Sequence, residues 1–200
     1  MLHAFFSNRR FWGLLFVAGL FWGCISTTAP VTKYYLLTPA DSFESLINDA
    51  NRKLPLSIEV SSLRLPQYLE RPYIVTRSSK NRLELAEFQQ WGGNLRKNMV
   101  RVFSKNLSVL LGTANIAISP HRAVSSPDYR IELTVNRFEL DGAGQVRLTA
   151  QWRLTRGREK ASVATRITEL ESPVIASGPD LEETVAAMGE LVGELSRIIA

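Results

Sequence analysis

The sequence has one cysteine and two histidines among its 200 residues. An intramolecular disulfide is therefore impossible, and a zinc site built from cysteine and histidine is nearly so. The chain also lacks the phosphate loop GxxxxGK, the dinucleotide pattern GxGxxG, the metalloprotease pattern HExxH and the hydrolase pattern GxSxG. These absences argue against nucleotide binding and the commonest hydrolases. We expect a protein that is not an enzyme and that binds no metal and no cofactor.

The few residues that could perform chemistry are poorly placed for it. His121 lies in a stretch flanked by prolines, which is typical of an exposed loop. The nearest pairs of carboxylates are Glu84 with Glu87 and Glu169 with Glu171. Nothing near either pair predicts a pocket that would shift one pKa, so we interpret both as solvated charges.

The sequence also has only a small excess of positive charge. Lysine and arginine total 24 against 19 aspartates and glutamates, a net charge of +5. Removal of Arg9 and Arg10 with the N-terminal segment would leave 22 − 19 = +3. This charge is too weak to predict nucleic-acid binding. The length leaves room for about one domain, and a 45% hydrophobic composition supplies a sizeable core.

The N-terminal segment has the pattern of a secretory signal. Arg9 and Arg10 precede an apolar run from Phe11 to Phe21. This run is far shorter than the roughly 20 residues that span a bilayer, so a cleaved signal is favoured over a permanent transmembrane helix.

Gly23 and Cys24 follow the apolar run, and together they resemble a bacterial lipoprotein signal, although Phe21 and Trp22 depart from its usual leucine and small residue. In such signals, cleavage before the cysteine makes it the first residue of the mature chain. The cysteine then carries a diacylglyceryl group and an amide-linked acyl chain such as palmitate. An incidental thiol is the alternative interpretation. Ile25 stands where an aspartate would favour the inner membrane, which implies an outer-membrane location.

We expect residues 1–23 to be the signal peptide, 24–33 the lipidated cysteine and linker, and 34–200 one periplasmic domain. The linker is small and polar and contains Pro30, which is typical of an extended segment. Its nine residues after Cys24 reach at most roughly 30 Å. The domain should therefore sit close to the membrane surface.

Short strands are predicted first in the domain. The apolar run at residues 34–37 is consistent with a buried strand, and further strands are expected at 56–65, 73–77, 83–88 and 115–119.

Three longer stretches alternate between apolar and polar residues, at 129–135, 146–154 and, less strictly, 161–170. The turns between them have hairpin length, so they predict an antiparallel meander with one solvated face. Phe138 is out of phase with the first stretch, which predicts a β-bulge near Asn136 or Arg137.

Two amphipathic helices complete the predicted α/β fold, a single domain with a mixed, mostly antiparallel sheet. The first runs from Trp91, a core residue, to Leu111 and ends at Gly112. The second begins near Pro179 and Asp180.

The two helices carry opposite charge. The first bears four bases and no acid, and the segment from residue 180 bears five acids against Arg197 alone. These are either two solvated faces, or a positive face that meets the negative face of the next subunit and closes a ring. The four bases are Arg96, Lys97, Arg101 and Lys105.

Several segments in order resemble the ABC-type transport auxiliary lipoproteins related to paraquat-inducible protein C and YmbA. They are YYLLTP at 34–39, LPQYLERPYIV at 65–75, LELAEFQQWGGNL at 83–95, NLSVLL at 106–111 and TVNRFELDGAGQVRLTAQW at 134–152.

This resemblance implies a fold like the N-terminal domain of TolB. It implies an outer-membrane lipoprotein that faces the periplasm and supports envelope integrity. Its partner would be an inner-membrane protein whose MCE domains form a tunnel for lipids, and it would form a homo-oligomeric ring. The alternative is a lipid carrier that encloses an acyl chain in its own cavity.

The resemblance also includes the segment from Pro66 to Leu69. Here Tyr68 and Leu69 either plug the end of the core or form an apolar docking point for a partner, with Arg101 and Lys105 as further docking residues.

Overall fold

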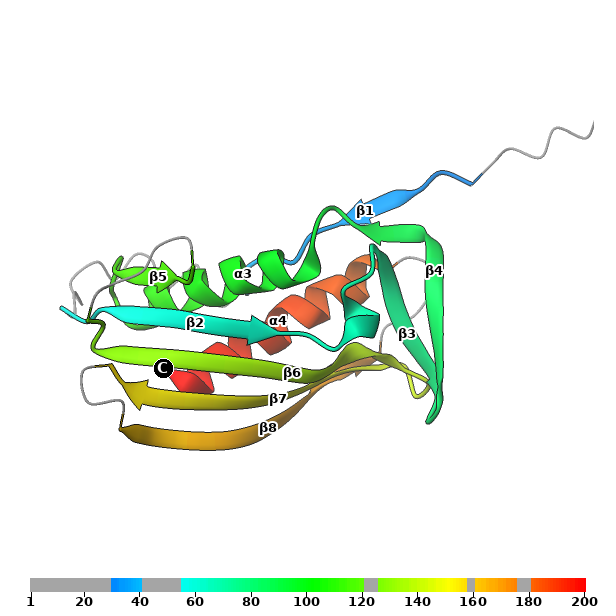
Figure 1. The fold of residues 1–200 in the computed structure, drawn as a ribbon. Coiled ribbons are helices and arrows are strands. Elements are labelled where there is room, and N and C mark those ends of the chain that lie inside the picture. The colour runs from blue at the N-terminus through cyan, green and yellow to red at the C-terminus, as the bar shows by residue number, and fades with distance from the viewer. Residues whose placement is uncertain (1–29, 41–54, 121–125, 158–160, 176–180) are drawn as a thin grey trace, which may run out of the picture. The chain divides into compact units, whose positions relative to one another are not determined.

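The computed structural model describes residues 30–40, 55–120, 126–157, 161–175 and 181–200. Within these, Thr32–Ala200 forms one compact unit. An open sheet of eight strands carries two long helices, α3 and α4, on one of its faces (Figure 1). The expected α/β fold with a mixed sheet and two main helices is confirmed.

The strands are β1 (Lys33–Tyr35), β2 (Ile58–Arg64), β3 (Tyr73–Ser79), β4 (Arg82–Trp91), β5 (Ile116–Ile118), β6 (Tyr129–Asp141), β7 (Gln145–Arg156) and β8 (Ser162–Ile175). The helices are α3 (Leu95–Leu110) and α4 (Glu182–Ile199), with a short 3-10 helix, η3 (Gln67–Leu69), between β2 and β3.

Strand β6 is the centre of the sheet. Along one edge it pairs with β7 in antiparallel register from Tyr129 to Leu140. Along its other edge it pairs first with β2 and then, at Leu140 and Asp141, with β3, both in parallel. Strands β2 and β3 therefore follow one another along the same edge of β6, and the segment that contains η3 connects them. The longest registers, β6 with β7 and β7 with β8, are antiparallel.

The predicted β-bulge is present. Val135 pairs with Ala150, but Arg137 pairs with Thr149, so Asn136 is the extra residue on β6. The bulge returns Phe138 to the buried side, where its side chain is fully covered. The meander is thus explained by its alternating sequence plus one inserted residue.

Helix α3 is bounded by local signals. Asn94 caps its start by accepting a hydrogen bond from the Lys97 amide at 3.0 Å. Gly112 follows its end with φ 59, a conformation that favours glycine. The predicted position of Trp91 at the helix start is wrong. Trp91 ends β4, donates its amide hydrogen to the Pro72 carbonyl at 2.7 Å and lies in the core.

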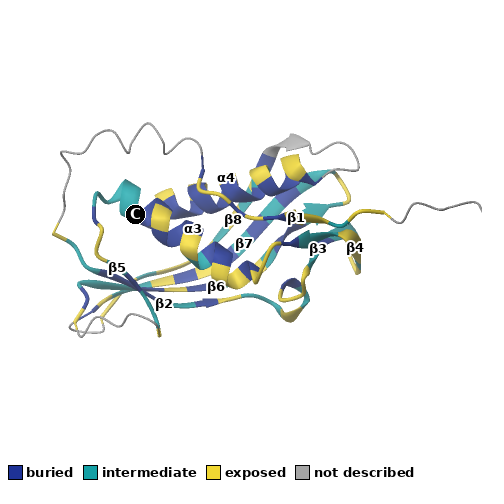
Figure 2. Cartoon of the chain, turned by 90° about the horizontal axis from the view of Figure 1, so that it is seen from above, coloured by how far each residue is buried: buried dark blue, intermediate teal, exposed yellow. Residues whose placement is uncertain are grey.

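Helix α4 lies over β7 and β8, and α3 lies over β2 and β5 (Figure 2). The dark blue stripes in that view are the buried faces that the two helices turn to the sheet and to each other. Glu182 and Glu183 occupy the first turn of α4, where acids favour the positive helix end. The predicted start at Pro179 and Asp180 lies outside the described residues.

The apolar run at 34–37 predicted a buried strand, and this prediction is only half right. Tyr35 and Leu37 are buried, whereas Tyr34 is 67% exposed and Leu36 51%. The reason is that, among the described strands, β1 pairs with β4 alone at the edge of the sheet, so the side chains on its outer face stay exposed.

Trp152 provides a test of the strand register. Its side chain is 4% exposed in the core, and its indole N–H donates to the Thr168 hydroxyl at 2.9 Å. We expect Trp152→Ala to lower the free energy of unfolding by about 3–5 kcal/mol, because it opens a large cavity. Gln151→Ala, an exposed neighbour on β7, should change it by less than about 0.5 kcal/mol. Urea unfolding measures both, and equal small losses would contradict the register.

Candidate functional site

The segment around η3 closes one end of the core. Leu69 is 2% exposed and packs among core side chains. Tyr68 is half-buried, and its hydroxyl donates to Glu139 Oε2 at 2.7 Å. Of the two interpretations of this segment, the structure therefore favours the plug for Leu69, whose side chain has no surface to offer a partner.

Glu139 is fully buried and accepts four hydrogen bonds. The Nε atoms of Arg77 and Arg137 donate to Oε1 at 2.7 and 2.9 Å. The Tyr68 hydroxyl and the Phe138 amide donate to Oε2 at 2.7 and 3.0 Å. Both carboxylate oxygens are thus satisfied, which is the condition under which a buried charge is tolerated.

The ion pairs continue from Glu139 across the sheet. Arg137 also approaches Asp141, which pairs with Arg147, and Arg147 pairs with Glu171. We call this alternating series the ionic chain: Arg77, Glu139, Arg137, Asp141, Arg147 and Glu171. It has three positive and three negative groups and connects β3, β6, β7 and β8.

Contacts in and beside the ionic chain shift the pKa values of Tyr68, Arg77 and Asp141. Burial and the hydrogen bond to Glu139 raise the pKa of Tyr68 above its usual range, so its hydroxyl stays a donor. The hydrogen bond to Glu139 also raises the pKa of Arg77. Burial opposes ionisation of Asp141, but bonds from Arg147 and from the amides of Gln145 and Ala143 outweigh it and lower its pKa.

A cationic groove runs between α3 and the strands β2 and β5, with a volume of about 770 Å³. Arg64 from β2 and Arg96, Lys97 and Arg101 from α3 line it, and no acid is among its lining residues. Arg96 pairs at 3.6 Å with Glu70, an exposed contact of small energetic value. Lys105 stands one helical turn beyond Arg101, on the same exposed stripe.

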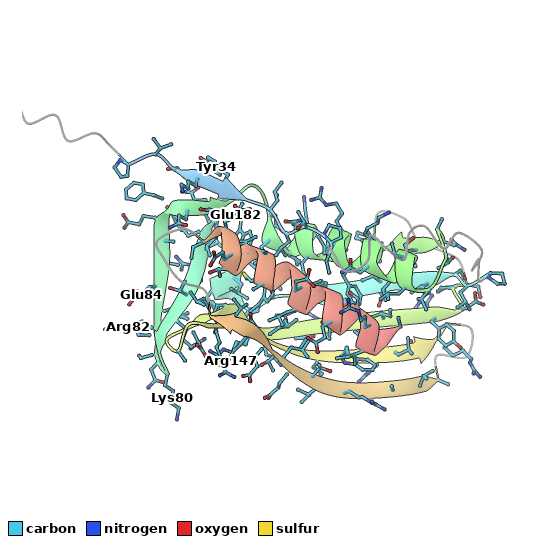
Figure 3. The ribbon with its side chains drawn as sticks, turned by 180° about the vertical axis from the view of Figure 1, so that it is seen from behind. Tyr34, Lys80, Arg82, Glu84, Arg147 and Glu182 are labelled. Carbon is cyan, nitrogen blue, oxygen red and sulfur yellow. The ribbon has the colours of Figure 1, made fainter. Side chains whose placement is uncertain are left out.

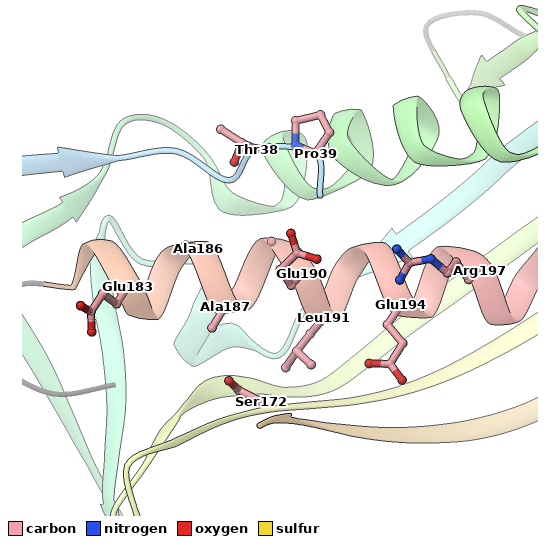
Figure 4. A pocket seen from close by; sticks show the side chains of 11 residues that line it. Thr38, Pro39, Ser172, Glu183, Ala186, Ala187, Glu190, Leu191, Glu194 and Arg197 are labelled. Carbon is pink, nitrogen blue, oxygen red and sulfur yellow. The ribbon is translucent and has the colours of Figure 1, made fainter. Parts of the chain in front are cut away.

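An acidic groove of about 510 Å³ lies along α4 (Figure 4). Glu183, Glu190 and Glu194 line it from the helix, together with Arg197 near its end. Thr38 and Pro39 line it on one side of the helix, and Ser172 from β8 lines it on the other (Figure 4). Thr38 and α4 approach closely because the helix has a glycine there: a Cβ at Gly189 would stand 3.0 Å from the Thr38 carbonyl oxygen.

The grooves give the molecule two edges of opposite charge on the helix layer. Arg101 lines the first groove and Lys105 extends its stripe, so the structure brings together these two of the four proposed docking residues. It does not bring Tyr68 and Leu69 to them. Gly23 and Cys24 lie outside the described residues, as does His121. Within the described ranges, no three His, Cys, Asp or Glu side chains gather closely enough to hold a metal ion.

Sequence reasoning missed Glu139 as an organising residue. A lone acid on an alternating strand is usually solvated, and Glu139 follows that pattern until the bulge is considered. Its one signal is its place beside Arg137, immediately after the phase shift that predicted the bulge. Its partners Tyr68 and Arg77 lie 71 and 62 residues away, so only the fold joins them.

A model of the family described as the ABC-type transport auxiliary lipoprotein component matches residues 35–200. One similar solved structure, an uncharacterised protein, is 20% identical, with a TM-score of 0.65 over 85% of this chain and 97% of that one. Another, a Xanthomonas campestris protein of the family DUF330, is 16% identical, with a TM-score of 0.62 over 84% and 90%. These likenesses show a shared fold. No curated protein matches the sequence.

Glu139→Gln tests the role of the buried carboxylate. The amide keeps the shape of the side chain but removes the buried negative charge that both Arg77 and Arg137 pair with, so we expect a loss of about 3 kcal/mol in the free energy of unfolding. Glu84→Gln removes the exposed pair with Arg82 and should cost less than about 1 kcal/mol. Urea unfolding at neutral pH compares the two. An equal cost for both variants would mean that the ionic chain is not a stabilising network.

Proposed function

The chain belongs to the ABC-type transport auxiliary lipoprotein component family through residues 35–200, and we propose that it is an outer-membrane adaptor. In this role it docks the tunnel of an inner-membrane MCE-domain protein to the outer membrane and performs no catalysis. Its location would be the periplasmic face of the outer membrane. Family membership carries this proposal, because the family is one of transport components and not of enzymes.

The shape of the interior favours an adaptor over a lipid carrier. A carrier needs an enclosed apolar cavity that holds an acyl chain. Between sheet and helices the space is filled by the protein's own side chains, and Phe103, Leu107, Leu133 and Phe138 are each fully buried there. The two grooves described above are instead open to solvent, and each carries charged side chains at its rim beside apolar ones, which suits contact with proteins.

The anchor in this proposal is Cys24, acylated after cleavage from Gly23. Among the described residues, no helix is long and apolar enough to cross a membrane. Several acyl chains on one cysteine make anchoring durable, because each buried methylene contributes about 0.8 kcal/mol.

Charge complementarity supports a homo-oligomeric ring. The cationic groove and the acidic groove flank different helices of one subunit, so the cationic groove of one copy can face the acidic groove of the next. A contact between two different surfaces repeats around an axis and closes into a ring when the rotation permits. Charges would set orientation and encounter rate in such a contact.

Cys24→Ala tests the anchor. We expect a protein that is not cleaved at the usual position, carries no acyl chains and does not partition with outer-membrane vesicles, because the only thiol of the chain is gone. Intact-mass spectrometry and vesicle flotation measure these properties. Ser26→Ala changes the same linker and should be acylated and anchored as the wild type is. Unlipidated wild-type protein in the soluble periplasm would contradict the anchor.

Charge reversal tests the ring. We expect light scattering of the fragment from Thr32 to show a closed oligomer, and Arg101→Glu with Lys105→Glu to shift it toward monomer. Adding Glu190→Lys with Glu194→Lys should restore assembly, because the two surfaces exchange sign. Lys80→Glu with Arg153→Glu makes the same change in net charge outside both grooves and serves as control.

Two results of that experiment would contradict the proposal in different ways. A wild-type monomer at tens of micromolar would argue against self-association by this domain alone. An oligomer indifferent to the reversals would keep the ring but remove the charged grooves from its interface.

A further inference from the structure

Three large apolar side chains are exposed together where the folded unit begins. Tyr34 is 67% exposed, Leu36 51% and Phe88 45%. Tyr34 pairs with Gln90 in the parallel register of β1 and β4, and Phe88 precedes Gln90 by two residues. Leu36 follows β1 by one residue and lies against Gly92, two residues after Gln90, so it continues the side on which Tyr34 lies. Phe88 is exposed two residues before Gln90, where the register of β4 with β3 shifts between Ala86 and Gln90. We call Tyr34, Leu36 and Phe88 the apolar patch.

The opposite side of the same two strands is core. Tyr35 and Trp91, which pair with each other, are 6% and 5% exposed. Figure 3 shows Tyr34 on the outer strand β1, beyond the end of α4 that begins at Glu182. The apolar patch therefore faces away from the helices, and none of its residues lines the cationic or the acidic groove.

The segment that carries Tyr34 and Leu36 is held firmly by hydrogen bonds. The Tyr35 hydroxyl donates to Gln89 at 3.0 Å, and the Tyr35 carbonyl accepts from the Gly92 amide at 2.7 Å. Just beyond the strand, the Asn98 side chain binds both the amide and the carbonyl of Leu37, at 2.7 and 3.1 Å. Tyr34 and Leu36 cannot turn inward without breaking these bonds, so their exposure is a fixed property of the fold.

We propose that the apolar patch rests in the headgroup region of the bilayer to which the chain is anchored. This inference depends on the proposed acylation of Cys24. The nine residues 25–33 follow Cys24 and end at Lys33, and they span at most roughly 30 Å. Since β1 begins at Lys33, the apolar patch is the first folded surface that the tether presents to the membrane.

The chemistry of the patch fits this occupant. Tyrosine has an apolar ring and a polar tip, and aromatic residues of this kind favour the bilayer interface. The acyl chains already supply affinity, so the patch would fix which side of the domain faces the membrane. No residue of the patch lines either charged groove, so both grooves would then stay free for proteins.

Exposure of apolar side chains alone does not carry the inference, because β8 supplies a counterexample. Val163 and Ile167 are 51% and 65% exposed, but they lie on the edge strand β8 and no tether leads to them. Their exposure is similar and they too are apolar, but they do not lie next to the linker. They are therefore the matched control.

Spin labels on single cysteines test the inference in the full chain. Acylation consumes the Cys24 thiol, so Tyr34→Cys, Leu36→Cys or Phe88→Cys each adds the only free thiol; Val163→Cys and Ile167→Cys are the controls. The acylated proteins are reconstituted into vesicles of phosphatidylethanolamine and phosphatidylglycerol. Each is compared with the same label on the unacylated fragment from Thr32 in buffer. Circular dichroism confirms that each variant is folded.

We expect the ratio of relaxation by oxygen to relaxation by a water-soluble nickel complex to at least double at positions 34, 36 and 88 on vesicles. It should stay unchanged at positions 163 and 167. An acylated, vesicle-bound protein whose five labels are equally accessible to nickel would overturn the role of the patch while leaving the anchor intact.

Two other outcomes would also overturn the inference. Labels at 34, 36 and 88 that are shielded from both reagents in buffer would show that a protein surface covers the patch. A wild-type chain without acyl mass that does not float with vesicles would remove the anchor, and the role of the patch with it.

Discussion

Glu139 lies where three strands meet, and its hydrogen bonds hold the middle of the sheet. Strand β6 is shared along one edge by β2 and then by β3, so the chain must leave the sheet between them at η3. Tyr68 from that interval and Arg77 from β3 both bind the buried carboxylate. The ionic chain then extends this arrangement through Arg147 to β8. A buried carboxylate is costly without partners. Because the partners of Glu139 come from β3, β6 and the η3 segment, satisfying its charge holds these three parts of the chain together.

The helix layer above this sheet separates charge. Helix α3 places its bases beside β2 and β5, and α4 places its acids on the far side, next to residues 38 and 39. Each helix turns an apolar stripe to the core, so its charges are confined to the outer edge of the layer. This separation gives one subunit two unlike surfaces. It is one ground for the proposed adaptor role in a family of transport auxiliary lipoproteins.

The N-terminal strand β1 connects the folded domain to the linker that follows the proposed membrane anchor. Bonds from β4 and from Asn98 fix β1 at the end of the sheet, so one of its faces is core and the other is open. The same strand follows the linker. The apolar patch is thereby placed near the proposed anchor, and the charged grooves lie along different elements. Three separate surfaces on one small domain would allow membrane, neighbouring subunit and transport partner to be contacted together.

The sequence by itself determined the elements whose signals are local. Alternation in 129–154 predicted the meander, the phase of Phe138 predicted the bulge, and Gly112 predicted the end of α3, because each depends on neighbours within a few residues. It also determined the opposite charges of the helices. Only the tertiary structure decided that Trp91 ends a strand, that Tyr34 and Leu36 face outward, and that Leu69 and Glu139 are buried. The physical reason is that burial depends on which distant strands pair: Tyr68 and Arg77 reach Glu139 across more than 60 residues.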